Sequence, residues 1–169
     1  MRFLTVLFLS VILTFSAFAQ SNKKAKPPAE TFIGTSLDGK EFNLTELKGK
    51  VVLVTFWSTK CPICAAETPR LNQLAAAYKG GNVVFLGLTT DNSKKVTSFV
   101  KKKPFNFNLL PNSFGILLKY ADKDGDGNVT MGYPAYYLIN QKGEIDLKTN
   151  GSDKKEQIAS EINRLLKTK

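Results

Sequence analysis

The 169-residue sequence contains no histidine and only two cysteines, Cys61 and Cys64. The lack of histidine excludes Ser-His and Cys-His catalytic pairs, histidine metal ligands and histidine-ligated haem. Two cysteines cannot form a four-thiolate zinc or iron–sulfur site within one chain, and they are too few for a disulfide-rich scaffold. The remaining composition, 43% apolar and 22% charged, is typical of a globular protein, and the length favours a single domain.

Acidic residues are also scarce. The chain has 24 Lys and Arg against 14 Asp and Glu, which gives a formal charge of +10. Lysines such as Lys94, Lys95, Lys154 and Lys155 are scattered, which favours solvated helix surfaces; a membrane surface or an acidic partner is the alternative interpretation. Nucleic acid is not expected as a partner, because the chain has no aromatic-basic recognition motif.

The N-terminus has the pattern of a secretory signal peptide over residues 1–19. Met1-Arg2 is a short positive start, Phe3–Phe18 is almost wholly apolar or small, and Ala17-Phe18-Ala19 is a cleavage motif. An uncleaved membrane anchor is the alternative, although a spanning helix needs roughly 20 apolar residues. We therefore expect a periplasmic or otherwise exported protein. In that oxidising compartment a lone cysteine pair is either a structural bridge or a redox site.

The rest of the chain predicts a solvated linker over residues 20–30 and an α/β domain over residues 31–169. Two apolar runs suit strands buried on both faces, as in a parallel or mixed sheet under helices. The predicted elements are a β-hairpin around Asp38-Gly39, strands at 51–57 and 83–88, a helix from Cys61 to Gly80-Gly81, a helix over 96–103 with three lysines in its last turn, a strand at 105–110, a short helix at 114–120, an antiparallel pair at 135–139 and 144–147, and a closing helix with Ile158, Ile162, Leu165 and Leu166.

The two cysteines form a Cys-x-x-Cys pair directly after a buried strand and at the start of a helix. Pro62 suits the first helical position, which places Cys61 at the N-cap and Cys64 about one turn into the helix. Free backbone N–H groups, the helix dipole and the neighbouring Lys60 would then stabilise a Cys61 thiolate. This arrangement predicts Cys61 as the nucleophile and Cys64 as the resolving thiol.

Two other roles for the cysteine pair stay open on the residues alone. A structural disulfide across two residues would close a very small loop and gain little loop entropy. Metal binding by the pair would need carboxylates, a methionine or a second chain, because histidine is absent. A c-type haem is excluded, because Ala65 stands where that motif needs histidine.

Glu67 lies three residues after Cys64, on the same face of the predicted helix. Partial desolvation there would favour its protonated form and suit it to pass protons to or from the thiols. The alternative is an ordinary acidic residue near a helix N-terminus. Pro69 removes one backbone donor and is expected to kink the helix.

The segment 122–128 carries aspartates at positions 1, 3 and 5 and glycine at position 6, as a calcium-binding loop does. Position 12 would be Tyr133, where such loops use a bidentate glutamate. We therefore expect a flexible loop beside the site, with calcium binding as the alternative.

Several motifs together resemble the thioredoxin-like proteins of the TlpA/ResA type, which are secreted or membrane-tethered bacterial thiol–disulfide oxidoreductases. The resemblance covers about residues 30–166 and rests on Phe56-Trp57, Cys61-Pro62-x-Cys64, Glu67, Pro69, Leu71 and Gly132-x-Pro134. It implies a thioredoxin fold, with a central mixed sheet flanked by helices and an extra N-terminal β-hairpin.

The resemblance also implies roles for individual residues. Cys61 attacks substrate disulfides and Cys64 resolves the mixed disulfide, while Glu67 matches the active-site glutamate of many members. Pro134 would be the family's cis-proline, packed opposite the cysteines. Tyr133 would offer backbone contacts to a substrate, and Trp57 and Pro62 complete the predicted substrate-binding residues.

Known members of this family act as reductants, often towards apocytochromes c. The expected partners are therefore proteins with disulfides and a membrane thiol–disulfide electron donor, and we expect a monomer without cofactor or metal. The sequence departs from many members at Lys60 and Ala135. A peroxiredoxin-like thiol peroxidase is the main alternative, with Ser58 fitting its motif but Val54 replacing the required proline. A non-catalytic thioredoxin-like adaptor is the other.

Overall fold

The computed structural model describes residues 25–168, so the predicted signal peptide lies outside the described residues. Its centre is a five-stranded sheet with strand order β5-β4-β3-β8-β9. The strands are β3 (Val51–Phe56), β4 (Val83–Leu88), β5 (Asn108–Leu110), β8 (Ala135–Ile139) and β9 (Ile145–Asn150). The first three run parallel and the last two pair antiparallel, which confirms the predicted mixed sheet.

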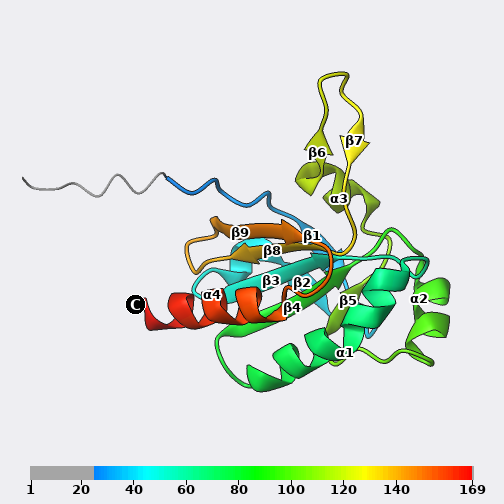
Figure 1. Cartoon of the computed structure of the whole chain (residues 1–169), viewed down its shortest axis with the longest axis horizontal. Coiled ribbons are helices and arrows are strands. Elements are labelled where there is room, and N and C mark those ends of the chain that lie inside the picture. Colours follow the sequence, from blue (N-terminus) through cyan, green and yellow to red (C-terminus); the bar gives the residue numbers. More distant parts are fainter. Residues whose placement is uncertain (1–24, 169) are drawn as a thin grey trace, which may run out of the picture.

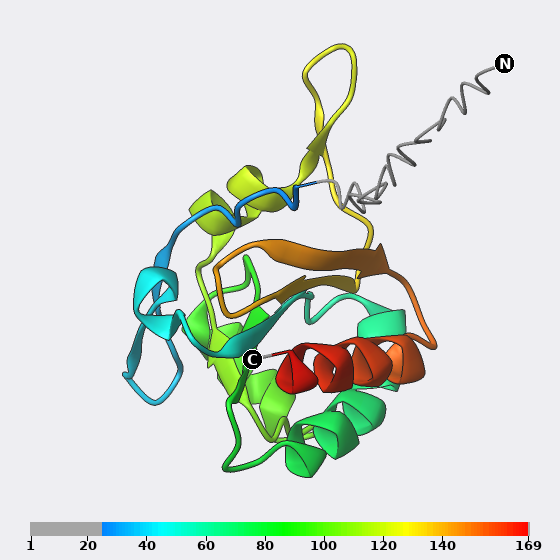
Figure 2. The same cartoon turned by 90° about the vertical axis from the view of Figure 1, so that its left-hand side faces the viewer.

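Residues along β3 alternate between two apolar layers. Val51 and Leu53 face the layer of helices α1 (Pro62–Ala77) and α4 (Lys155–Lys167), which lie against the same side of the sheet (Figure 2). The Tyr78 hydroxyl joins these two helices by donating to Asn163 Oδ1 at 2.9 Å. Because every residue of β3 is buried, the strand that leads to the cysteines is anchored on both faces.

The opposite face is covered by the N-terminal segments and by helix α3 (Phe114–Tyr120). The predicted hairpin is present as β1 (Ile33–Thr35) and β2 (Glu41–Asn43), followed by a 3-10 turn, η1 (Leu44–Leu47). Helix α2 (Ser93–Val100) packs beside the end of the sheet that carries the cysteines (Figure 1). Within residues 25–168, no helix combines the length and apolar character that a membrane span requires.

The predicted linker is partly wrong, because its last residues pack on the domain. Ala29 donates its N–H to the Gly143 carbonyl, and the Pro27 carbonyl accepts from Ile145, both within 3 Å. Ala29 is consequently 8% exposed. The lysines at the start of the segment favoured a solvated linker, and the sequence gives no local signal for this short pairing with the turn before β9.

Two predicted boundaries in the middle of the chain are also wrong. β5 begins at Asn108 and not at residue 105. The segment before it bonds instead to α1, because the Asn72 side chain donates to the Pro104 carbonyl and accepts from the Asn106 N–H, at 2.8 Å each. Helix α2 ends at Val100, so the three lysines at 101–103 follow the helix and do not form its last turn.

The predicted loop at 122–128 is instead the tip of a small hairpin, β6 (Asp122–Lys123) and β7 (Val129–Thr130), that projects from the domain (Figure 1). The Asp124 carboxylate accepts hydrogen bonds from the Asn128 side chain and from the N–H groups of Asp126 and Asn128. Among residues 25–168, no cluster of three or more Cys, Asp or Glu side chains is placed to hold a metal ion.

Candidate active site

Cys61 and Cys64 form a disulfide at the start of α1. Cys61 is the N-cap of the helix and Pro62 its first residue, as the sequence predicts. The Cys64 N–H donates to the Cys61 sulfur at 3.0 Å, so one free N–H of the helix end already points at this atom. Cys64 is only 4% exposed, whereas Cys61 is half-buried. Cys61 is therefore the cysteine that an incoming group can reach.

The loop that leads from β3 to Cys61 is held by one carboxylate, that of Asp91. Its Oδ2 atom accepts from the Thr59 N–H at 2.8 Å, from the Thr59 hydroxyl at 3.0 Å and from the Ser58 hydroxyl at 3.1 Å. The Ser58 carbonyl in turn accepts from the Cys61 N–H at 3.1 Å. Burial would raise the pKa of Asp91, but the hydrogen bonds from Thr59, Ser58 and Thr89 outweigh it and lower the pKa.

Beneath the cysteines lies an aromatic layer centred on Trp57. Its ring packs against Phe99 and Phe105, with centroids 5.3 and 4.7 Å away, and the same cluster includes Cys64. Trp57 is 2% exposed, so it supports the site from below. Its Nε1–H is buried without a hydrogen-bond partner among residues 25–168. A side chain at Gly87 would lie 2.7 Å from the Leu109 side chain and 3.2 Å from this nitrogen, so glycine leaves room for both groups.

Glu67 is 2% exposed, on the inner face of α1 one turn after Cys64. Its carboxylate accepts a hydrogen bond from the Arg70 guanidinium, which also lies 3.3 Å from Asp153. Burial raises the pKa of Tyr136 on β8, and the nearby negative charge of Glu67 raises it further. Glu67 is thus a buried, paired carboxylate within the cysteine helix. The helix itself continues through Pro69.

The peptide bond between Tyr133 and Pro134 is cis, as the resemblance implied. Pro134 is buried, and its carbonyl accepts from Gly151 at 2.9 Å. Tyr133 packs against the cluster that contains Trp57 and Cys64. Burial and the charge of Asp91 raise the pKa of the Tyr133 hydroxyl. Within residues 25–168, neither the N–H nor the C=O of Tyr133 has a hydrogen-bond partner, so both remain available.

Two site residues were missed by the sequence reasoning. Arg70 follows Glu67 at a spacing of three, which places the two on one helix face and could have been recognised as an ion pair. Asp91 lies shortly after β4, the parallel neighbour of the strand that leads to the cysteines. Polar residues at the carboxyl ends of adjacent parallel strands meet at one edge of the sheet. Applied to the two predicted strands, this rule could have identified Asp91 as a site residue.

Residues 20–166 match the family described as Redoxin. The chain belongs to the Redoxin family. Thiol-disulfide oxidoreductase ResA of Bacillus thuringiensis subsp. konkukian (strain 97-27) is 30% identical over 141 residues, covering 81% of this chain and 76% of that protein. The structure of a secreted Mycobacterium tuberculosis disulfide oxidoreductase is 28% identical with a TM-score of 0.61, covering 79% of this chain and 96% of that chain.

The fold has further support from a thioredoxin family protein of Chlorobium tepidum TLS. It is 24% identical with a TM-score of 0.70 and covers 84% of this chain and 97% of that chain. This Redoxin-family protein is therefore a thiol–disulfide oxidoreductase of the TlpA/ResA type with a thioredoxin fold. Its Cys61–Cys64 disulfide is the pair that such chemistry opens and closes.

Proposed function

We propose that this protein is an exported reductant of protein disulfides, in which Cys61 attacks and Cys64 resolves. The observation that carries the proposal is the asymmetry of the pair at the helix start. Cys61 is half-buried at the N-cap of α1, while Cys64 is 4% exposed and packed in the aromatic cluster. A substrate disulfide can reach the Cys61 sulfur more easily than the Cys64 sulfur, so exposure determines which cysteine attacks the substrate.

The reaction begins from the reduced dithiol. The Cys61 thiolate attacks one sulfur of the substrate disulfide, forms a mixed disulfide and releases the other substrate sulfur as a thiolate. The Cys64 thiolate then attacks the Cys61 sulfur, breaks the mixed disulfide and releases the second substrate thiol. Two electrons pass to the substrate and the Cys61–Cys64 disulfide is left. The N–H of Cys64, which already points at the Cys61 sulfur, stabilises the thiolate that attacks.

Glu67 is the proposed proton carrier for Cys64. The buried thiol must lose its proton before it attacks, and histidine is absent from the chain. Glu67 lies one turn along the same helix with 2% exposure, and it is the buried carboxylate of α1. Arg70 acts as a positioning residue, because its guanidinium holds the Glu67 carboxylate.

The proposed substrate-binding residues surround Cys61. The free backbone groups of Tyr133 suit an extended substrate segment, which would pair with them as one strand pairs with another. Pro62 is exposed beside Cys61 and offers an apolar contact. Trp57 does not fit the substrate-binding role that the resemblance implied, because it is 2% exposed; its proposed role is to pack beneath the cysteines.

The cellular role is proposed from the N-terminal pattern and the relatives. Residues 1–19 have the features of a signal peptide, and one relative is described as a soluble secreted antigen of Mycobacterium bovis. An exported reductant needs a source of electrons, which we assign to a thiol–disulfide donor in the membrane. Apocytochromes c are the proposed substrates, since cytochrome c maturation requires reduced cysteines.

An equilibrium redox titration of the wild-type pair against dithiothreitol tests the direction of the reaction. We expect a potential near that of thioredoxin, about −270 mV, so that the reduced protein passes electrons to substrates. A potential near that of a strong oxidant, about −120 mV, would overturn the reductant assignment. Hydrogen peroxide consumption, measured in parallel, should be no faster than that of a Cys61→Ser variant; faster turnover would favour the peroxidase alternative.

A further inference from the structure

The outer edge of the sheet is only half covered. β5 is the outermost strand beside β4, and their pairing comprises Leu86 with Asn108, Gly87 with Leu109 and Leu88 with Leu110. The first half of β4 therefore has no neighbouring strand on this side. We call residues 83–85 the β4 edge.

The hydrogen-bond pattern shows which backbone groups this edge presents. The Asn82 carbonyl accepts from Val51 at 2.9 Å and the Leu88 carbonyl accepts from Trp57 at 3.0 Å, so the even-numbered residues of β4 bond to β3. Backbone groups alternate along a strand, so the odd-numbered residues face the other side. The N–H and C=O of Val83 and the N–H of Phe85 thus point to a side without a strand.

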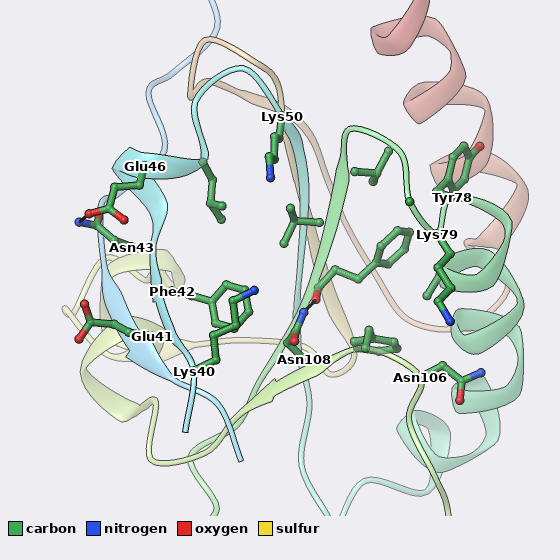
Figure 3. A pocket seen from close by; sticks show the side chains of 17 residues that line it. Lys40, Glu41, Phe42, Asn43, Glu46, Lys50, Tyr78, Lys79, Asn106 and Asn108 are labelled. Carbon is green, nitrogen blue, oxygen red and sulfur yellow. Dashed lines mark hydrogen bonds between the residues drawn. The ribbon is translucent and has the colours of Figure 1, made fainter. Parts of the chain in front are cut away.

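A hollow of about 410 Å³ lies along the β4 edge, between the N-terminal hairpin and the end of α1 (Figure 3). The wall is mixed, with more polar than apolar surface. Its apolar part comes from Phe42 on the hairpin, whose ring centroid lies 5.0 Å from Lys40 Nζ, from Val84 and Phe85 on β4, and from Phe107 before β5. The hollow therefore combines unpaired backbone groups with apolar surface. This combination is what an extended peptide needs in order to add a strand to a sheet.

Three lysines surround the hollow: Lys40, Lys50 and Lys79. All three are exposed, and none of them forms an ion pair within residues 25–168. Figure 3 shows Lys40 and Lys50 reaching into the space between the hairpin and β4, with Lys79 on the helix side. Glu41 and Glu46 also line the hollow, but their carboxylates point to the outer side of the hairpin in Figure 3.

We propose that the β4 edge binds an extended acidic segment of a partner protein as an additional strand. The segment's backbone pairs with Val83 and Phe85, and its alternating side chains point towards the hairpin on one side and α1 on the other. Acidic side chains meet Lys40 and Lys50 on the first side, and apolar side chains face α1 on the second. A second copy of this chain fits poorly, because the same lysines would then face one another.

This site is separate from the cysteines. The β4 edge lies at the end of α1 that is opposite to Cys61, and a helix of 16 residues is about 24 Å long. A partner held there leaves the disulfide accessible. The proposal thus adds a docking surface to the oxidoreductase, and binding at this surface does not depend on the redox state of the cysteines.

Fluorescence anisotropy with a dye-labelled eight-residue peptide of alternating glutamate and valine tests the proposal on the full-length protein. We expect salt-sensitive binding that is the same before and after treatment with dithiothreitol, and no binding of the lysine–valine counterpart. Lys40→Gln together with Lys50→Gln should weaken binding about tenfold. Lys94→Gln together with Lys95→Gln removes the same charge on α2 and should leave affinity unchanged. Equal losses in both double variants would contradict the site.

The strand-addition step has a test of its own. Val83→Pro removes an outward N–H without removing a bond to β3, and it should weaken peptide binding as strongly as the loss of two lysines. Amide hydrogen exchange on the wild-type protein gives the same answer without a substitution: the peptide should slow exchange at Val83 and Phe85. If the lysine variants weaken binding while exchange at these two amides is unchanged, the hollow is a simple anion site and the strand proposal fails.

Discussion

Asp91 is the residue whose removal should loosen the active-site loop most directly. Its Oδ2 atom accepts three hydrogen bonds from Thr59 and Ser58, at 2.8 to 3.1 Å. Asp91→Asn keeps the size of the side chain but removes the charge, and hydrogen bonds to a charged acceptor are about twice as strong as neutral ones. Such bonds contribute about 1.5–3 kcal/mol each, and partial solvation and shared geometry reduce their sum. We therefore expect a loss of about 2 kcal/mol of unfolding free energy at pH 7.

Urea unfolding followed by tryptophan fluorescence measures this loss, because Trp57 is the single tryptophan and lies beside the loop. With a slope of about 2 kcal/mol per molar urea, the midpoint should fall by about 1 M. Asp126→Asn provides the matched control. It removes the same charge from the tip of the β6–β7 hairpin, away from the cysteines, and should leave the midpoint unchanged. An Asp91→Asn midpoint equal to that of the wild type would refute the reasoning.

The pH dependence of the same variant supplies a second check with a defined sign. The pKa of Asp91 is lowered in the folded protein from its ordinary value of 3.8. Its contribution to stability is therefore fully present above pH 3.8 and is lost as the pH falls through the lower folded pKa. The gap in unfolding free energy between wild type and Asp91→Asn should be constant from pH 7 to pH 5 and should shrink below pH 3.8. A gap that widens on acidification would contradict the assigned hydrogen bonds.

Three further predictions concern packing, proton transfer and the Glu67–Arg70 ion pair. Gly87→Ala should destabilise the fold by about 2 kcal/mol in thermal unfolding, because its new carbon would lie 2.7 Å from the Leu109 side chain; Gly115→Ala, which meets nothing within 4 Å, should have no such effect. Glu67→Gln should slow thiol–disulfide exchange roughly tenfold or more and change its pH profile, as measured by stopped-flow reduction of a small disulfide. Arg70→Gln should keep a pH-dependent rate but lower the unfolding midpoint, because it leaves a buried carboxylate unpaired. An unchanged pH profile in Glu67→Gln would remove that residue from proton transfer.

Local chemistry explains what the sequence could predict. Pro62 after Cys61 determines a helix start, and the all-buried β3 shows as a continuous apolar run. Asp38-Gly39 fits its turn because Gly39 has a φ of 82°. These signals depend on neighbouring residues, so the order of the elements and the position of the cysteine pair can be read directly.

The differences arise where distant residues decide the outcome. β5 is shortened by the side chain of Asn72, which comes from α1 more than 30 positions earlier. The loop clamp depends on Asp91, which is 32 residues from Thr59 in sequence. The β6–β7 hairpin has only two residue pairs, too few to give an alternating pattern. Such contacts join residues that are far apart in the sequence, so local propensities cannot predict them.

The central claim is that Cys61 attacks and Cys64 resolves, and trapping the mixed disulfide tests it most directly. Reduced Cys64→Ser and reduced Cys61→Ser are each mixed with a disulfide-containing substrate protein, and the products are identified by mass spectrometry under non-reducing conditions. We predict a stable one-to-one adduct through Cys61 in the Cys64→Ser variant and little adduct in the Cys61→Ser variant. A dominant adduct through Cys64 in the Cys61→Ser variant, with none through Cys61, would contradict the assignment.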